Sequence, residues 1–220
     1  MKKVVSGWFT IFLCALLTCA APREARADGK VLYENNFEKA DLDKVPDDFL
    51  VLDGAFAVKQ EDGNKFLELP GAPLSDSGMG VLFGPSKESG VTVSARFYGT
   101  RKGRRYPTFA LGVNGQAGFR LQVSPAKDAL ELFKGDQIVA TKEFKWNSGT
   151  WYFLKLQIKP DGDGVKIDAK AWASKETEPT EWQVTASDKT KPPAGKASVW
   201  GTPYSGTPIR FDDLKVAETE

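Results

Sequence analysis

The chain has 220 residues, with 30 Lys and Arg against 29 Asp and Glu and a formal net charge of +1. This near balance gives no global attraction to nucleic acid or anionic lipid, so we expect neither as a partner. Histidine is absent, which excludes Ser-His-Asp and Cys-His nucleophilic machinery and histidine metal sites.

Residues 1–27 have the features of a secretory signal peptide. Two lysines precede an apolar run over 4–21, and Ala25-Arg26-Ala27 supplies the small residues that a signal peptidase requires. No later stretch approaches the ~20 apolar residues of a membrane-spanning helix. We therefore expect cleavage after Ala27 and one domain, 28–220, exported to the periplasm or the extracellular space without membrane contact.

Both cysteines, Cys14 and Cys19, lie in this leader. The exported domain then contains no disulfide and depends on its hydrophobic core for stability. Because residues 16–19 weakly resemble a lipoprotein signal, a lipid anchor on Cys19 is the alternative to full release.

After the leader, short runs of β-type residues are separated by Gly, Pro, Asn and Asp, and no helical period is sustained. This spacing is typical of an antiparallel sandwich or barrel. Single helical turns are expected at 38–44 and 126–129. The predicted strands are 31–37, two within 49–59, 65–69, 91–98, 108–113, 119–123, 129–134, 137–144, 182–186, 197–201 and 209–216, besides a hairpin over 149–172.

The hairpin over 149–172 has the clearest pattern, with apolar residues at every second position on both sides of an Asp-Gly turn. A lone hairpin cannot bury its apolar face, so a second sheet is implied. In the last strand, Ile209 and Phe211 have one parity and Leu214 and Val216 the other. We therefore expect an all-β, two-sheet antiparallel sandwich, with a β-bulge at Asp212-Asp213 and the last strand paired to the first.

Four segments of the chain resemble segments of one known superfamily. They are 36–38, 149–157, 169–172 with 178–182, and 209–216. Taken in order, they resemble the concanavalin A-like lectin/glucanase superfamily and, within it, bacterial laminin G-like domains. The resemblance spans nearly the whole exported domain and implies a jelly-roll sandwich. Members of this superfamily include lectins, glycan-binding modules and glycosidases, so the resemblance also implies a carbohydrate partner.

The chain departs from the enzymes of this superfamily. It lacks the Glu-x-Asp-x-x-Glu strand that places the carboxylates of glucanases on one face. Residues 108–115 also differ from the Asn-Ser-Gly strand of the distantly similar 3-keto-disaccharide hydrolase-like domains. We therefore expect no catalysis. The alternatives are a glycoside hydrolase that uses outward carboxylates such as Glu68 and Glu131, and a structural or adhesive domain without a small ligand.

Outward-facing polar and aromatic residues are candidates for a sugar site. Arg96 and Arg120 are expected to form a polar ladder along one face, with aromatic rings as stacking platforms; the alternative is ordinary packing with the polar tips in solvent. The candidates of this kind are Arg96, Tyr98, Arg120, Gln122, Trp200 and Tyr204.

A basic loop over 101–107 is the second candidate. Guanidinium groups bind sulfate, phosphate and carboxylate bidentately, so an anionic glycan could dock on Arg104, Arg105 and Tyr106. The alternative is a solvated loop that prevents edge-to-edge association of strands.

No cofactor is expected. The alternative is a structural calcium ion at Asp212-Asp213 beside Glu38, where the first and last strands meet, although calcium needs at least six oxygen ligands. The sequence therefore predicts an exported, non-catalytic carbohydrate-binding β-sandwich whose ligand is a polysaccharide or a surface glycan.

Overall fold

The computed structural model describes residue 1 and residues 29–71 and 78–219, so the predicted signal peptide lies almost wholly outside the described residues. Within these ranges the chain forms strands and one short 3-10 helix, η1 (Pro125–Lys127). The strands are β1 (Val31–Asn35), β2 (Leu50–Asp53), β3 (Ala57–Glu61), β4 (Asn64–Leu69), β5 (Met79–Lys87), β6 (Val91–Tyr98), β7 (Thr108–Val113), β8 (Phe119–Ser124), β9 (Ala129–Lys134), β10 (Gln137–Glu143), β11 (Tyr152–Asp161), β12 (Gly164–Ala173), β13 (Val184–Asp188), β14 (Gly195–Thr202) and β15 (Ile209–Glu218).

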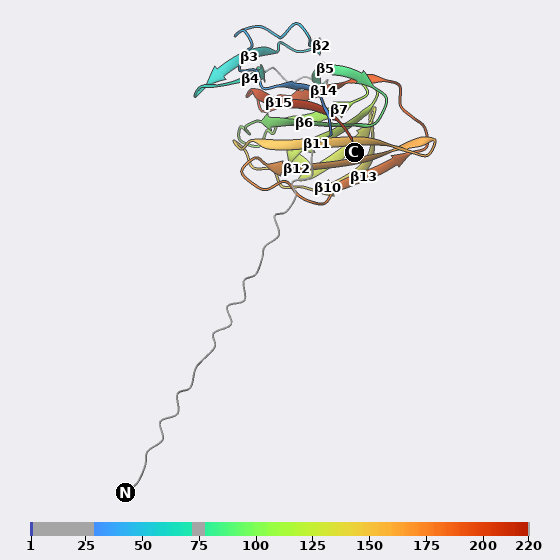
Figure 1. The fold of residues 1–220 in the computed structure, drawn as a ribbon. Helices are drawn as coiled ribbons and strands as arrows, with labels where there is room; N and C mark the ends of the chain where they lie inside the picture. The colour runs from blue at the N-terminus through green and yellow to red at the C-terminus, as the bar shows by residue number, and fades with distance from the viewer. Residues whose placement is uncertain (2–28, 72–77, 220) are drawn as a thin grey trace.

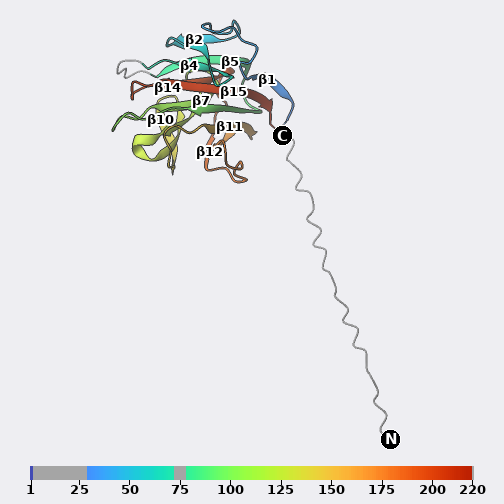
Figure 2. The same ribbon diagram turned by 90° about the vertical axis from the view of Figure 1, so that its left-hand side faces the viewer.

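The strands form two antiparallel sheets that pack face to face (Figures 1 and 2). The eight-stranded sheet has the order β13-β12-β11-β6-β15-β4-β3, with β1 paired to β15. The seven-stranded sheet has the order β10-β9-β8-β7-β14-β5-β2. The predicted fold class, an all-β, two-sheet jelly-roll sandwich, is confirmed.

The core lies between the sheets because alternate side chains of each strand point inward. In β6, Val91, Val93, Ala95 and Phe97 are buried, and the intervening residues are half-buried. Phe97 stacks on Phe109 of the opposite sheet, with ring centroids 5.5 Å apart. This parity also decides which side chains reach the outer face of each sheet.

The predictions for the closing strand are confirmed. β15 pairs with β1, and its register against β6 shifts between Asp212 and Lys215. Asp213 has a φ of 48°, the left-handed conformation that accommodates the extra residue of a bulge.

The sequence pattern missed β5, because Gly80, Gly84 and Pro85 are typical turn residues. In the structure Gly80 lies within this strand, opposite Trp200 of β14. The helical turn expected at 38–44 is wrong, since these residues form turns, whereas η1 falls near the turn expected at 126–129. The described residues include no helix long and apolar enough to cross a membrane.

An ion pair between Lys134 of β9 and Asp188 of β13 joins the two sheets. The hydrogen bond from Lys134, assisted by the Thr190 N–H, lowers the pKa of Asp188 from 3.8 to about 2. The stabilisation is therefore present above about pH 4 and is lost as the pH falls toward 2.

Asp188→Asn should lower the free energy of unfolding by less than ~1 kcal/mol at neutral pH, because the Lys134 side chain is 43% exposed. At about pH 2 the deficit of the variant should be much smaller, since the Asp188 carboxylate is then about half protonated in the folded protein. Urea titrations at the two pH values measure this difference. A deficit that persists at the lower pH would show that the ion pair is not its cause.

Candidate functional site

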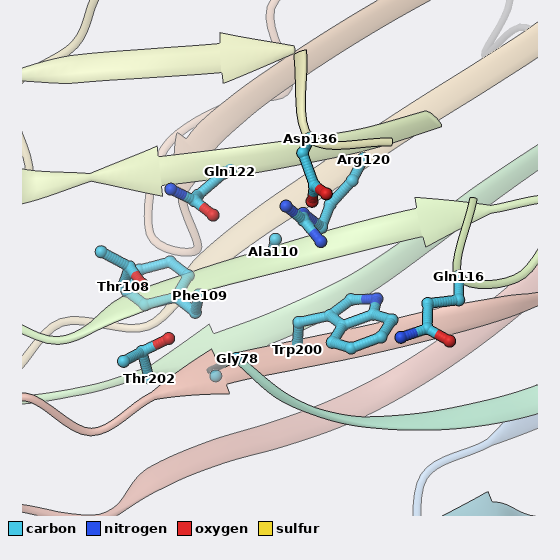
Figure 3. Close-up of a pocket in the computed structure, with 11 residues that line it drawn as sticks. Gly78, Thr108, Phe109, Ala110, Gln116, Arg120, Gln122, Asp136, Trp200 and Thr202 are labelled. Carbon is cyan, nitrogen blue, oxygen red and sulfur yellow. The ribbon is translucent and has the colours of Figure 1, made fainter. Parts of the chain in front are cut away.

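The outer face of the seven-stranded sheet is hollowed into a groove of about 430 Å³ (Figure 3). It lies over β7, β8 and β14, beside the turn that joins β9 to β10. The residues that line it are Gly78, Thr108, Phe109, Ala110, Gln116, Arg120, Gln122, Asp136, Trp200, Gly201 and Thr202.

Trp200 forms the floor of this groove and is 8% exposed. Its indole occupies space that two glycines of neighbouring strands leave open. A Cβ on Gly80 would lie 2.4 Å from Trp200 Cε3, and one on Gly112 would lie 3.4 Å from Trp200 Nε1. The indole N–H donates a 2.8 Å hydrogen bond to Ser198 Oγ, which fixes the orientation of the ring.

Arg120 projects over this floor from β8. Its guanidinium carbon lies 5.6 Å from the centroid of the Trp200 ring and 5.1 Å from that of Phe133, so an aromatic ring flanks it on each side. Burial lowers the pKa of Arg120 below its ordinary value, and Asp136 partly offsets this effect. Within the described part of the chain, no protein group accepts a hydrogen bond from its buried Nε.

The rim of the groove is polar. Asp136 points toward Arg120, Gln116 lies at one end of the groove, and Thr108 and Thr202 lie at the other end (Figure 3). Gln122 donates its amide N–H to Ser124 Oγ at 3.0 Å, which leaves its carbonyl oxygen facing the groove region as an acceptor. Asp136 lies between the predicted strands 129–134 and 137–144, and nothing in that pattern indicated its part in this site.

Glu131 belongs to an internal network beside the groove. It is 3% exposed, accepts a 2.5 Å hydrogen bond from Ser124, and pairs with Lys127 at 2.9 Å. Glu68 lies on β4 of the eight-stranded sheet, where it pairs with Arg210. Since these two carboxylates lie on opposite sheets and point away from the shared core, they cannot flank one glycosidic bond, and this candidate catalytic pair is wrong.

The predicted ladder of Arg96 and Arg120 is also wrong, because β6 and β8 belong to different sheets. Arg96 pairs with Asp212 and Asp213 on the outer face of the eight-stranded sheet and lies 5.0 Å from the centroid of the Trp151 ring. Tyr98 packs on Trp151 there, with centroids 5.4 Å apart. Strand parity determines which face a side chain occupies within its sheet, but not which sheet contains the strand.

The basic loop lies away from the groove. Lys102 and Arg105 form a two-residue bridge across its turn, and Arg104 and Arg105 are exposed and line neither groove. Arg101 and Tyr106 line a second groove of about 450 Å³ beside Trp146. Tyr204, 41% exposed in the turn after β14, lines neither groove.

Replacing both Arg104 and Arg105 with Ala should change the free energy of unfolding by less than ~1 kcal/mol, because both side chains are exposed. Binding of a sulfated or uronic-acid polymer through this loop should weaken in the variant and should fall with salt, since exposed charges are screened within ~8–10 Å. Normal binding of such a polymer by the variant at low salt would identify the loop as a solvated connection.

The carboxylates considered for calcium have protein partners. Arg96 contacts both Asp212 and Asp213, and Glu38 accepts the backbone N–H of Lys65 at 3.0 Å. In the ranges 29–71 and 78–219, no group of three or more Asp, Glu, Cys or His side chains could hold a metal ion. The absence of a cofactor stays a prediction.

Two antiparallel sheets with this strand order form a jelly-roll sandwich, and one of its outer faces carries a groove. No protein-family model and no curated protein matches the chain.

Several solved structures are similar to it. One is the carbohydrate-binding module CBM66 from Bacillus subtilis, with 15% identity over 78% of this chain and 96% of the module and a TM-score of 0.53. A B. subtilis protein of unknown function with a galectin-like fold has 13% identity over 87% of this chain and 97% of its own, with a TM-score of 0.60. The Emp47p carbohydrate recognition domain has 10% identity, covers 88% of this chain and 98% of its own, and has a TM-score of 0.53. At these identities the similarities show the fold alone.

Proposed function

We propose that this protein is an exported, non-catalytic carbohydrate-binding domain of the laminin G-like kind, and that a polysaccharide or surface glycan lies in the groove over Trp200. The observation that carries the proposal is the groove itself. An indole forms its floor, a guanidinium with an unpartnered buried N–H lies over it, and hydrogen-bonding groups that include the carboxylate of Asp136 surround it. Sugars present apolar ring faces beside hydroxyl groups, so they match such a mixture of aromatic and polar groups.

The lining of the groove supports this proposal over hydrolysis, and the open sheet face supports it over adhesion. Two of the similar structures are described as a carbohydrate-binding module and a carbohydrate recognition domain. Among the residues that line the groove, Asp136 is the single carboxylate, whereas glycoside hydrolysis uses two on either side of the scissile bond. A purely structural domain would be expected to have covered sheet faces, and the seven-stranded sheet has an open one.

Affinity electrophoresis of the protein through gels that contain different polysaccharides tests the proposal. We expect retardation by at least one polymer and no release of reducing sugar from it. Migration that no polymer retards, together with no signal on a glycan array, would reject a carbohydrate ligand.

Gly80→Ala should weaken this binding at least about tenfold, because the added Cβ would lie 2.4 Å from Trp200 Cε3 and would displace the indole. Overpacking of this kind should also cost ~1–3 kcal/mol of stability. Gly99→Ala is the control, since Gly99 does not line the groove and its added Cβ would lie 3.1 Å from Pro107 Cγ. Equal binding by Gly80→Ala and wild type would mean that the position of Trp200 does not matter for the ligand.

A further inference from the structure

We propose that the groove selects an uncharged sugar residue, with one hydroxyl bound by Arg120 and a neighbouring hydroxyl bound by Asp136. This inference rests on the proposed function and narrows its ligand class. It excludes sulfated and uronic-acid residues from this site. It makes no statement about binding of anionic glycans to the basic loop.

The first observation concerns Arg120. A guanidinium has only donors, and a buried donor without an acceptor costs about 1–3 kcal/mol. The Nε of Arg120 is such a donor, and no hydrogen bond or ion pair joins this side chain to any other described residue. Phe133 and Trp200 flank the guanidinium, so it is held in place by packing without using its hydrogen-bonding capacity.

The second observation concerns Asp136, which has only acceptors when ionised. It follows Gly135 in the turn between β9 and β10, is exposed, and points toward the guanidinium of Arg120 (Figure 3). The charge of Asp136 raises the pKa of Arg120, so the two groups interact across the groove without a direct ion pair. The site therefore offers a donor-only group and an acceptor-only group side by side.

A sugar diol matches this pair because each hydroxyl is both donor and acceptor. One hydroxyl accepts from the guanidinium, and its neighbour donates to the carboxylate. An anionic sugar satisfies Arg120 but brings a second negative charge close to Asp136, and like charges repel each other. The lining residues contain one cation and one anion, so the groove has no net charge to attract an anion.

Asp136→Asn distinguishes neutral from anionic ligands, because it should change the affinity for the two classes in opposite directions. For a neutral ligand it removes a charged acceptor, so affinity should fall about tenfold. For an anionic ligand it removes a repulsive charge, so affinity should rise. Asn is well suited to a turn, so the fold should be retained. Asp163→Asn is the matched control, because Gly162-Asp163 forms the same kind of Gly-Asp turn in the β11–β12 hairpin. The φ angle of Gly162 is 58°, and that of Gly135 is 55°.

The experiment compares gels of neutral polymers (arabinan, galactan, dextran) with gels of anionic polymers (polygalacturonate, alginate, chondroitin sulfate). The anionic gels use the Arg104→Ala/Arg105→Ala background, so that the two loop guanidinium groups expected to bind anionic polymers are absent. We expect a neutral polymer to retard the wild type, and both Asp136→Asn and Arg120→Gln to weaken this about tenfold or more, with Asp163→Asn unchanged.

Two results would overturn the inference while the proposed function stands. In the first, only anionic polymers retard the protein, and Asp136→Asn strengthens this retardation. In the second, a neutral polymer retards the protein, and Asp136→Asn leaves this retardation unchanged. Retardation by no polymer of either class would reject the proposed function itself.

Discussion

Arg96→Ala should lower the free energy of unfolding by about 3–5 kcal/mol, because it leaves a buried carboxylate without its cation. The Asp212 side chain is 1% exposed, and Arg96 Nη2 donates to its Oδ2 at 2.6 Å. The groups that would remain are Asn64 at 3.0 Å and the backbone N–H of Asp213 at 2.7 Å. Neither carries the charge that compensates the desolvation of Asp212.

Urea titration measures this loss, and its dependence on pH identifies the cause. Burial is the largest influence on the pKa of Asp212 and raises it, while Asn64 and Arg96 act in the opposite direction. Removing Arg96 raises this pKa further, so the folded state binds a proton more readily than the unfolded chain. The deficit of the variant should therefore shrink as the pH falls toward about 4.

Two further variants complete this test. Asp212→Asn in the Arg96→Ala background should recover part of the loss, because no buried charge remains. Lys44→Ala is the control, since Lys44 and Asp41 form a pair whose side chains are 71% and 76% exposed, and it should cost less than ~1 kcal/mol. A cost for Arg96→Ala no larger than that of the control would show that this buried pair contributes little.

Trp200→Ala should have the largest effect on binding. It removes the floor of the groove and one of the two rings that hold Arg120. We expect binding to fall below detection in affinity gels and the free energy of unfolding to fall by ~3–5 kcal/mol, as for other buried tryptophans.

Trp200→Phe tests the role of the indole in binding with a smaller effect on folding than Trp200→Ala. It retains an aromatic ring but loses the hydrogen bond to Ser198, so we expect a smaller stability loss, about 1–3 kcal/mol, and clearly weaker binding. Trp151→Ala is the control, because Trp151 lies half-buried on the opposite outer face. Normal binding by folded Trp200→Ala protein would place the ligand elsewhere.

Local sequence patterns predicted much of the sandwich because sheet parity is a local property. The alternation over 149–172 predicted β11 and β12, and the phase change at Asp212-Asp213 predicted the bulge of β15. The pattern missed β5 partly because Gly80 leaves space for the side chain of Trp200, which lies 120 positions away in the chain.

The site was predictable only in part. The sequence predicts Arg120, Gln122 and Trp200 as candidates for a sugar site, and the structure brings these three together in one groove. Arg96 and Tyr98 have the same outward parity but lie on the other sheet, because strand order depends on long-range pairing that alternation does not encode. Asp136 acquires its position only when the β9–β10 turn lies beside β8.

The strand order also constrains when the domain can fold. β14 lies between β5 and β7 in one sheet, and β15 lies between β4 and β6 in the other. In each sheet, therefore, one of the last two strands connects strands from the early part of the chain to strands from its middle part. Until they emerge from the ribosome, the preceding strands form separate blocks with unpaired edges. A chain that is exported with its amino terminus first would therefore stay unfolded through most of its translocation and complete both sheets only at the end of its passage.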